Sequence, residues 1–241
     1  MHTRLLLALL FFVSRNASAY VGTTKLEAKL DVRVSEYSLS ASGLADALTR
    51  VANQFRLPMG IEWVRNETAL RNLNLAWKQD TVRAILSSVT RAYPGYAFRI
   101  ERGVVHVFRR DLVNEKQNFL NLKVPESFEA RDESGGFANQ QLLYVVQNMV
   151  TPRSLPPGAG VGGDYATGME EKPLTLQLGG VTVREALEIL VEASEHKVWV
   201  VTFSDGSTLT STGFLRTETL WHPTPFPDRD QPMWDFLAWG Q

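Results

Sequence analysis

Cysteine is absent from the 241-residue sequence. The chain therefore has no disulfide, no thiolate nucleophile, no cysteine-ligated zinc and no lipid-modified N-terminal cysteine. Beyond the N-terminus it also lacks an apolar run long enough to span a bilayer, so we expect no integral membrane segment in the mature chain. The hydrolase pattern G-x-S-x-G does not occur either. These absences predict that the protein is not an enzyme and has no catalytic residues, no cofactor and no metal ligands.

An excess of positive charge is missing as well. The chain has 25 Lys and Arg residues against 26 Asp and Glu residues, which gives a formal net charge of −1. Proteins that bind polyanions usually carry a basic surface, so this balance argues against a nucleic-acid partner.

The N-terminus has the three parts of a signal peptide. Arg4 is followed by nine apolar residues at 5–13 and by the small residues Ala17, Ser18 and Ala19. This pattern predicts a signal peptide over residues 1–19, cleaved after Ala19. A buried N-terminal helix is the alternative. Export without cysteine is more typical of a bacterial envelope than of a eukaryotic secretory route, so we expect a periplasmic or secreted protein.

Two stretches of the sequence are alike when shifted by 101 positions. L-N-L at 73–75 and T-V-R at 81–83 recur as L-T-L at 174–176 and T-V-R at 182–184. Each copy continues into a helical pattern and then a short aromatic strand, with Phe98 in the first and Trp199 in the second. A repeat of this length predicts a duplicated domain rather than a solenoid, whose repeats are shorter.

The first half predicts the order strand, helix, strand, strand, helix, strand, strand. Apolar residues recur at i, i+3, i+4 and i+7 in both helices, with Asp46, Thr49, Arg50 and Asn53 on the solvent side of the first. Ser42 and Asp80 are the predicted N-caps. The strand near 59–63 is expected to bury one face. The predicted strands are 32–39, 59–63, 73–77, 96–100 and 104–108, and the helices are 44–55 and 82–93.

The second half is a looser copy that contains a Gly/Pro-rich insertion at 151–170. It predicts strands at 119–124, 174–178 and 197–203, helices at 142–150 and 183–191, and a turn at 132–133. The fold class is therefore α+β, with two tandem small domains that each pack two amphipathic helices on a small mixed sheet. The expected organisation is a signal peptide at 1–19, domains at 30–110 and 118–204, and a tail at 205–241.

The segments 44–48, 73–75, 81–89 and 96–100 resemble the short N-terminal domain of secretins and TonB-dependent receptors. The resemblance covers residues 32–109, with a weaker likeness over 119–203. It implies a periplasmic module that meets other proteins through sheet edges or helix faces and performs no catalysis. In those families the domain precedes a membrane barrel, and no such region follows here. Pore formation and active uptake are therefore not expected.

Each of the three histidines in the mature sequence has a structural interpretation. His106 alternates with valines in a predicted hairpin strand, which places it on a solvated face. His196 follows Glu192 and Glu195 at the end of a helix, where it interacts favourably with the helix dipole. A Glu/His metal site there is the alternative, although the sequence offers no further ligands nearby. His222 lies in the tail.

A row of glutamates and a glycine-rich segment are two further candidate sites. Glu185, Glu188 and Glu192 lie opposite the apolar stripe of their helix, which predicts a solvated face; an acid–base pair is the alternative. The glycines of 158–163 satisfy G-x-G-x-x-G. A dinucleotide site needs a strand before these glycines and a helix after them, but two prolines precede them and no helical pattern follows until Val183. This segment is therefore predicted to be a flexible loop.

The C-terminal tail is rich in proline and aromatic residues. Aromatic side chains spaced along an extended segment can anchor in pockets of a partner. The alternative is that the tail covers its own second domain, because exposed aromatics reduce solubility. The candidate partner-binding residues are Trp221, Phe226, Trp234, Phe236 and Trp239.

Together these features predict an exported, non-enzymatic protein-interaction module, an accessory of a secretin- or receptor-type assembly of the cell envelope. The partner's identity is not given by the sequence. The alternative is a protein that binds a small ligand or glycan in a crevice between the two domains, framed by Trp63, Trp77 and Trp199.

Overall fold

The computed structural model describes residues 25–64, 71–116, 118–150, 173–194, 196–203 and 214–219. The predicted signal peptide, the Gly/Pro-rich insertion and the five aromatic residues of the tail lie outside these ranges. Among the described residues, none of the helices combines the length and the apolar character needed to cross a membrane.

The first half of the chain follows the predicted order. A helical segment at 25–30 precedes it. Its elements are β1 (Arg33–Ala41), α2 (Leu44–Phe55), β2 (Met59–Val64), β3 (Leu73–Thr81), α3 (Val82–Arg91), β4 (Tyr96–Glu101) and β5 (Val104–Arg109).

The second half differs from the prediction at four places. The helix predicted at 142–150 begins at Gly135. The predicted strand at 119–124 is wrong, because η1 (Phe119–Asn121) is a 3₁₀ turn there. The predicted turn at 132–133 belongs to a strand, and another strand begins at Phe214, inside the predicted tail. The remaining elements are β6 (Glu129–Glu133), α4 (Gly135–Val150), β7 (Leu174–Gln177), α5 (Val183–Ala193), β8 (His196–Phe203) and β9 (Phe214–Thr219).

The sequence repeat of 101 positions is also seen in the structure, where two pairs of corresponding elements begin 101 residues apart. β3 begins at Leu73 and β7 at Leu174, while α3 begins at Val82 and α5 at Val183. Each helix has a threonine N-cap: Thr81 accepts a hydrogen bond from the Ala84 N–H, and Thr182 accepts one from the Glu185 N–H. The cap of α3 is thus Thr81, not the predicted Asp80.

The start of α2 also differs from the prediction. Its N-cap is Gly43, which makes no side-chain cap, while the N–H and hydroxyl of Ser42 donate to the carboxylate of Asp46. Asp46 and Thr49, predicted to face solvent, are buried. Asp46 can be buried because Ser42 and Arg50 satisfy its carboxylate oxygens.

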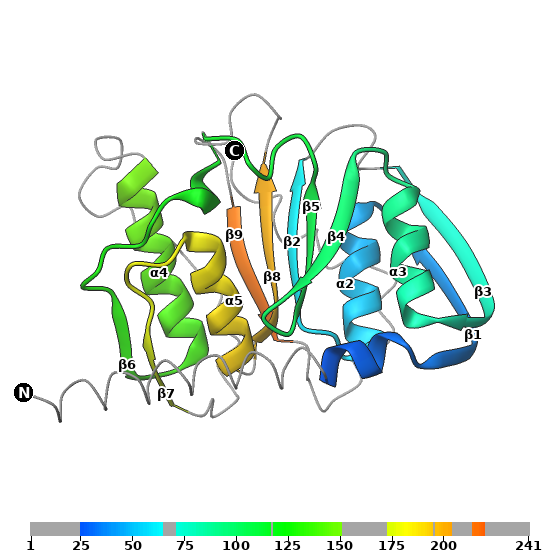
Figure 1. Ribbon diagram of the computed structural model, residues 1–241, viewed down its shortest axis with the longest axis horizontal. Helices are drawn as coiled ribbons and strands as arrows, with labels where there is room; N and C mark the ends of the chain where they lie inside the picture. The colour runs from blue at the N-terminus through cyan, green and yellow to red at the C-terminus, as the bar shows by residue number, and fades with distance from the viewer. Residues whose placement is uncertain are drawn as a thin grey trace, which may run out of the picture.

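A five-stranded mixed sheet forms the centre of the molecule, in the order β4-β5-β2-β8-β9. β2 pairs in parallel with β5 on one side and with β8 on the other. The hairpins β4–β5 and β8–β9 are antiparallel. Two smaller antiparallel sheets, β1–β3 and β6–β7, lie at the two ends of the molecule (Figure 1). This arrangement confirms the α+β class, and both halves of the chain contribute strands to the central sheet.

The helices of the two halves cover opposite faces of that sheet (Figure 1). Ile61 and Val200 belong to the core formed with α2 and α3, whereas Val64 and Val201 belong to the core formed with α4 and α5. All six residues of β2 are buried as a result, although the sequence predicts only one buried face. A central parallel strand covered on both faces has no solvated side.

Candidate functional site

Charged side chains are buried between the central sheet and α5. Glu62 on β2 is 3 % exposed, and its Oε1 atom lies 2.7 Å from Nε2 of His106 and 2.5 Å from Nε of Arg184. Its other oxygen accepts a hydrogen bond from Asn118 at 3.2 Å. Both carboxylate oxygens are therefore satisfied without water, as a buried charge requires.

The segment that links the two halves fixes the guanidinium of Arg184. Arg184 lies in the first turn of α5 and donates to the side chain of Asn121 and to the carbonyl of Val113. Asn118 in turn accepts a hydrogen bond from the Leu120 N–H. The linker between the halves is thus part of the buried network.

His106 lies at the centre of this network, on β5. Its side chain is 0 % exposed, so the predicted solvated position is wrong. The sheet register places Gly60 between His106 and Trp199 on the two neighbouring strands. The rings of His106 and Trp199 approach to 5.6 Å between centroids. Because Gly60 has no side chain, the indole can lie directly over it.

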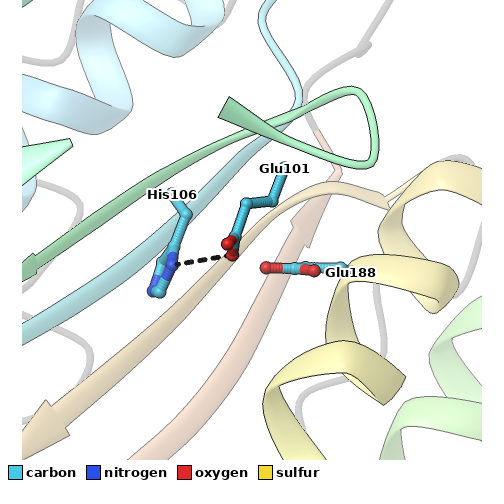
Figure 2. A group of neighbouring side chains, drawn as sticks. All are labelled: Glu101, His106 and Glu188. Atoms are coloured by element: carbon cyan, nitrogen blue, oxygen red, sulfur yellow. Dashed lines mark ion pairs between the residues drawn. The ribbon is translucent and has the colours of Figure 1, made fainter. Parts of the chain in front are cut away.

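Two more carboxylates converge on the other nitrogen of the imidazole. Figure 2 shows Glu101, at the end of β4, and Glu188, on α5, directed toward His106. Nδ1 of His106 lies 3.8 Å from Oε2 of Glu101, which is an ion-pair distance but too long for a hydrogen bond. Glu188 is 2 % exposed, so the predicted solvated face is wrong at this residue.

The environment shifts the pKa values of these groups in opposite directions. Burial favours neutral Glu62, but the hydrogen bond from His106 and the charge of Arg184 outweigh burial and lower the pKa of Glu62. Burial likewise opposes charge on His106, yet the nearby carboxylates of Glu101 and Glu62 raise its pKa. The adjacent imidazole lowers the pKa of Glu101. Burial raises the pKa of Glu188 to about 7.

The shifted pKa of Glu188 predicts a pH-dependent stability. Its pKa rises from a usual 4.5 to about 7, so the folded chain binds more protons than the unfolded chain in that interval. Glu188 therefore makes the free energy of unfolding fall by about 3 kcal/mol as pH rises through the interval. His106, whose pKa is also raised, acts in the same direction.

Glu188→Gln removes one of these two contributions. We expect urea unfolding at about pH 5 and about pH 8 to show a smaller loss of stability in the variant than in the wild type. Glu192→Gln, an exposed position on the same helix, serves as the control and should behave as the wild type does. An equal pH dependence in all three proteins would contradict the burial of an ionisable Glu188.

The other candidate residues named from the sequence either lie away from the buried network or fall outside the described residues. Glu185 belongs to the cap of α5 and forms an ion pair with Arg102 at 2.5 Å, and Glu192 is exposed. His196 begins β8, although its side chain is outside the described part. Trp221, Phe226, Trp234, Phe236 and Trp239 are not among the described residues, so their role stays a prediction.

The three tryptophans that were expected to frame a ligand crevice are buried. Trp199 is fully enclosed, Trp77 stacks on Tyr37 in the core, and Trp63 packs in the same core cluster. The prediction that these rings frame an open crevice is therefore wrong, because all three are enclosed in the two hydrophobic cores.

A second feature of functional interest is the surface of α4. The helix has 16 residues, GGFANQQLLYVVQNMV, without a charged residue. Phe137 is 44 % exposed and Tyr144 is 60 % exposed. They are seven positions apart and therefore share one face of the helix. Asn148, also exposed, continues that face. We refer to Phe137, Tyr144 and Asn148 as the α4 face.

Comparison with known proteins finds no matching family model, curated protein or solved structure. The likeness to the short N-terminal domain of secretins and TonB-dependent receptors therefore stays a prediction.

Proposed function

We propose that the protein is an exported, non-enzymatic interaction module of the bacterial envelope, which binds a protein partner through the α4 face. The observation that carries the proposal is the pair of exposed aromatic side chains on an uncharged helix. Interface cores are enriched in aromatic residues and depleted of charged ones, and helix surfaces that face water are usually charged. The partner's matching surface should therefore be apolar and uncharged.

The signal-peptide pattern and the resemblance to secretin and receptor domains support a partner in a secretin- or receptor-type envelope assembly. The α4 face is separate from the buried network, since α4 packs against α5 and the network lies between α5 and the central sheet. Loss of partner binding and loss of folding can therefore be tested independently.

Paired substitutions on the surface test this function. Phe137→Arg with Tyr144→Arg places two charges on the α4 face and should reduce capture of the partner from a bacterial envelope extract at least about tenfold, because each buried charge would lack a counter-charge. The control, Asn53→Arg with Gln54→Arg, adds the same charges at two exposed positions of α2. It should capture the same protein as the wild type, identified by mass spectrometry.

Both double variants should unfold at nearly the wild-type urea midpoint, since exposed substitutions change stability by no more than about 0.5 kcal/mol each. Equal capture by both variants would exclude the α4 face from partner binding.

A further inference from the structure

Three side chains, those of Glu101, His106 and Glu188, each offer a ligand atom to a common point. These atoms lie within 4.8 Å of one another. Two of the side chains are completely or almost completely buried, and Glu101 is 39 % exposed at its side chain. The point lies between the sheet and α5 (Figure 2). It borders solvent on the side of Glu101.

The tautomer of His106 is set by Glu62. The Glu62 carboxylate is ion-paired with Arg184 and can only accept hydrogen bonds. His106 must therefore donate from Nε2, at 2.7 Å, and in the neutral ring this leaves a lone pair on Nδ1. A histidine that binds a metal through one ring nitrogen usually donates a hydrogen bond from the other nitrogen to a carboxylate, which fixes the orientation of the ring.

Two buried polar atoms at this point have no hydrogen-bond partner within the described residues: Nδ1 of His106 and Oε1 of Glu188. Buried polar atoms of native proteins are nearly always satisfied, so a pair of unsatisfied atoms directed at one point indicates a bound group. Both atoms are lone-pair donors when the ring and the carboxylate are deprotonated. A cation satisfies both at once.

We propose that Glu101, His106 and Glu188 bind a divalent transition-metal ion of the zinc type, with Glu62 orienting the imidazole. One imidazole nitrogen with two carboxylates suits zinc better than calcium or magnesium, which prefer oxygen ligands alone. Zinc bonds of about 2.0–2.1 Å place ligand atoms roughly 3.4 Å apart. Side-chain rotations that move each ligand atom by roughly 1 Å would therefore complete the site. Three protein ligands leave a fourth position for water on the Glu101 side.

Two of the carboxylates around the site are already paired with arginines. Glu62 is neutralised by Arg184, and Glu101 lies 2.9 Å from Nε of Arg99. A carboxylate has two oxygens and several lone pairs, so Glu101 can contact Arg99 and a metal ion together. The ion would connect β4 and β5 of the first half to α5 of the second half, whatever partner the α4 face binds.

Zinc titration of the full chain, freed of tags and stripped of metal with a chelator, tests the site. Isothermal calorimetry should find one zinc ion bound per chain, and the bound ion should raise the thermal unfolding midpoint. Cobalt(II) should give the visible absorption of a low-coordinate site with nitrogen and oxygen ligands.

Glu188→Gln and Glu101→Gln should each weaken zinc binding at least about tenfold. Glu192→Gln, which alters an exposed carboxylate of the same helix, should bind zinc as the wild type does. Glu101 is partly exposed, so Glu101→Gln should fold normally even if a change at the buried Glu188 disturbs the core. Absence of stoichiometric binding, or unchanged affinity in Glu101→Gln and Glu188→Gln, would overturn the proposal.

Discussion

Gly60→Ala should destabilise the protein by about 3 kcal/mol or more, at the upper end of the range for an overpacked core. The added Cβ would lie 2.3 Å from ring atoms of Trp199. The indole is fully buried and is flanked by His106, while β2 is held by a strand on each side, so neither the ring nor the backbone can move aside cheaply. Urea unfolding of the variant measures the loss.

Trp199→Leu tests whether the contact between the added Cβ and the indole causes the loss of stability in Gly60→Ala. The substitution removes the three indole atoms nearest to the added Cβ, and it breaks no hydrogen bond of the indole within the described part of the chain. In a double-mutant cycle we expect Gly60→Ala to cost at least about 1 kcal/mol less in the Trp199→Leu background. A cost of Gly60→Ala within about 0.5 kcal/mol of zero would mean that the two strands do not pair in this register.

Arg184→Met should cost about 3–5 kcal/mol, because it leaves the buried carboxylate of Glu62 without its counter-charge. Methionine approximates the length of the arginine stem and keeps its packing, but the hydrogen bonds to Asn121 and Val113 are lost together with the charge. Replacing Glu62 by Gln in the same chain should restore part of the lost stability, since the uncompensated charge is then gone. Urea unfolding of the two single variants and the double variant measures both effects.

Arg131→Met provides a matched control. Arg131 and Glu129 form an ion pair at 2.5 Å, the same distance as between Arg184 and Glu62, but the Arg131 side chain is 75 % exposed. Exposed ion pairs contribute no more than about 1 kcal/mol, so this variant should unfold close to the wild type. If the two arginine variants lost equal stability, the argument from burial would be wrong.

Local patterns predicted most elements of the fold. The apolar stripes of α2, α3 and α5 and the hairpin of β4 and β5 lie where the sequence places them, because periodicity depends only on neighbouring residues. The pairing of β2 with β8 could not be predicted in this way. It joins residues more than 130 positions apart, and no local pattern specifies which strands become neighbours.

The buried site was missed for the same reason. His106 was predicted to lie on a solvated face, and the strand that contains Glu62 was predicted to bury one face only, whereas the other half of the chain covers the second face. A signal was available in the sequence. The residues two positions away from His106 are Val104 and Phe108, so both faces of that strand are apolar apart from the histidine. A strand of this kind is typical of a sheet covered on both faces, where a polar side chain needs a partner.

The central position of β2 sets an order of events during synthesis. The strand is complete at Val64, but its neighbour β8 begins only at His196, so 132 further positions must be made before one edge of β2 is paired. During that interval the nascent chain presents an apolar strand edge that can pair wrongly with other chains. The protein should therefore depend on a holding chaperone while it is made, and a chain truncated before residue 196 should aggregate rather than fold.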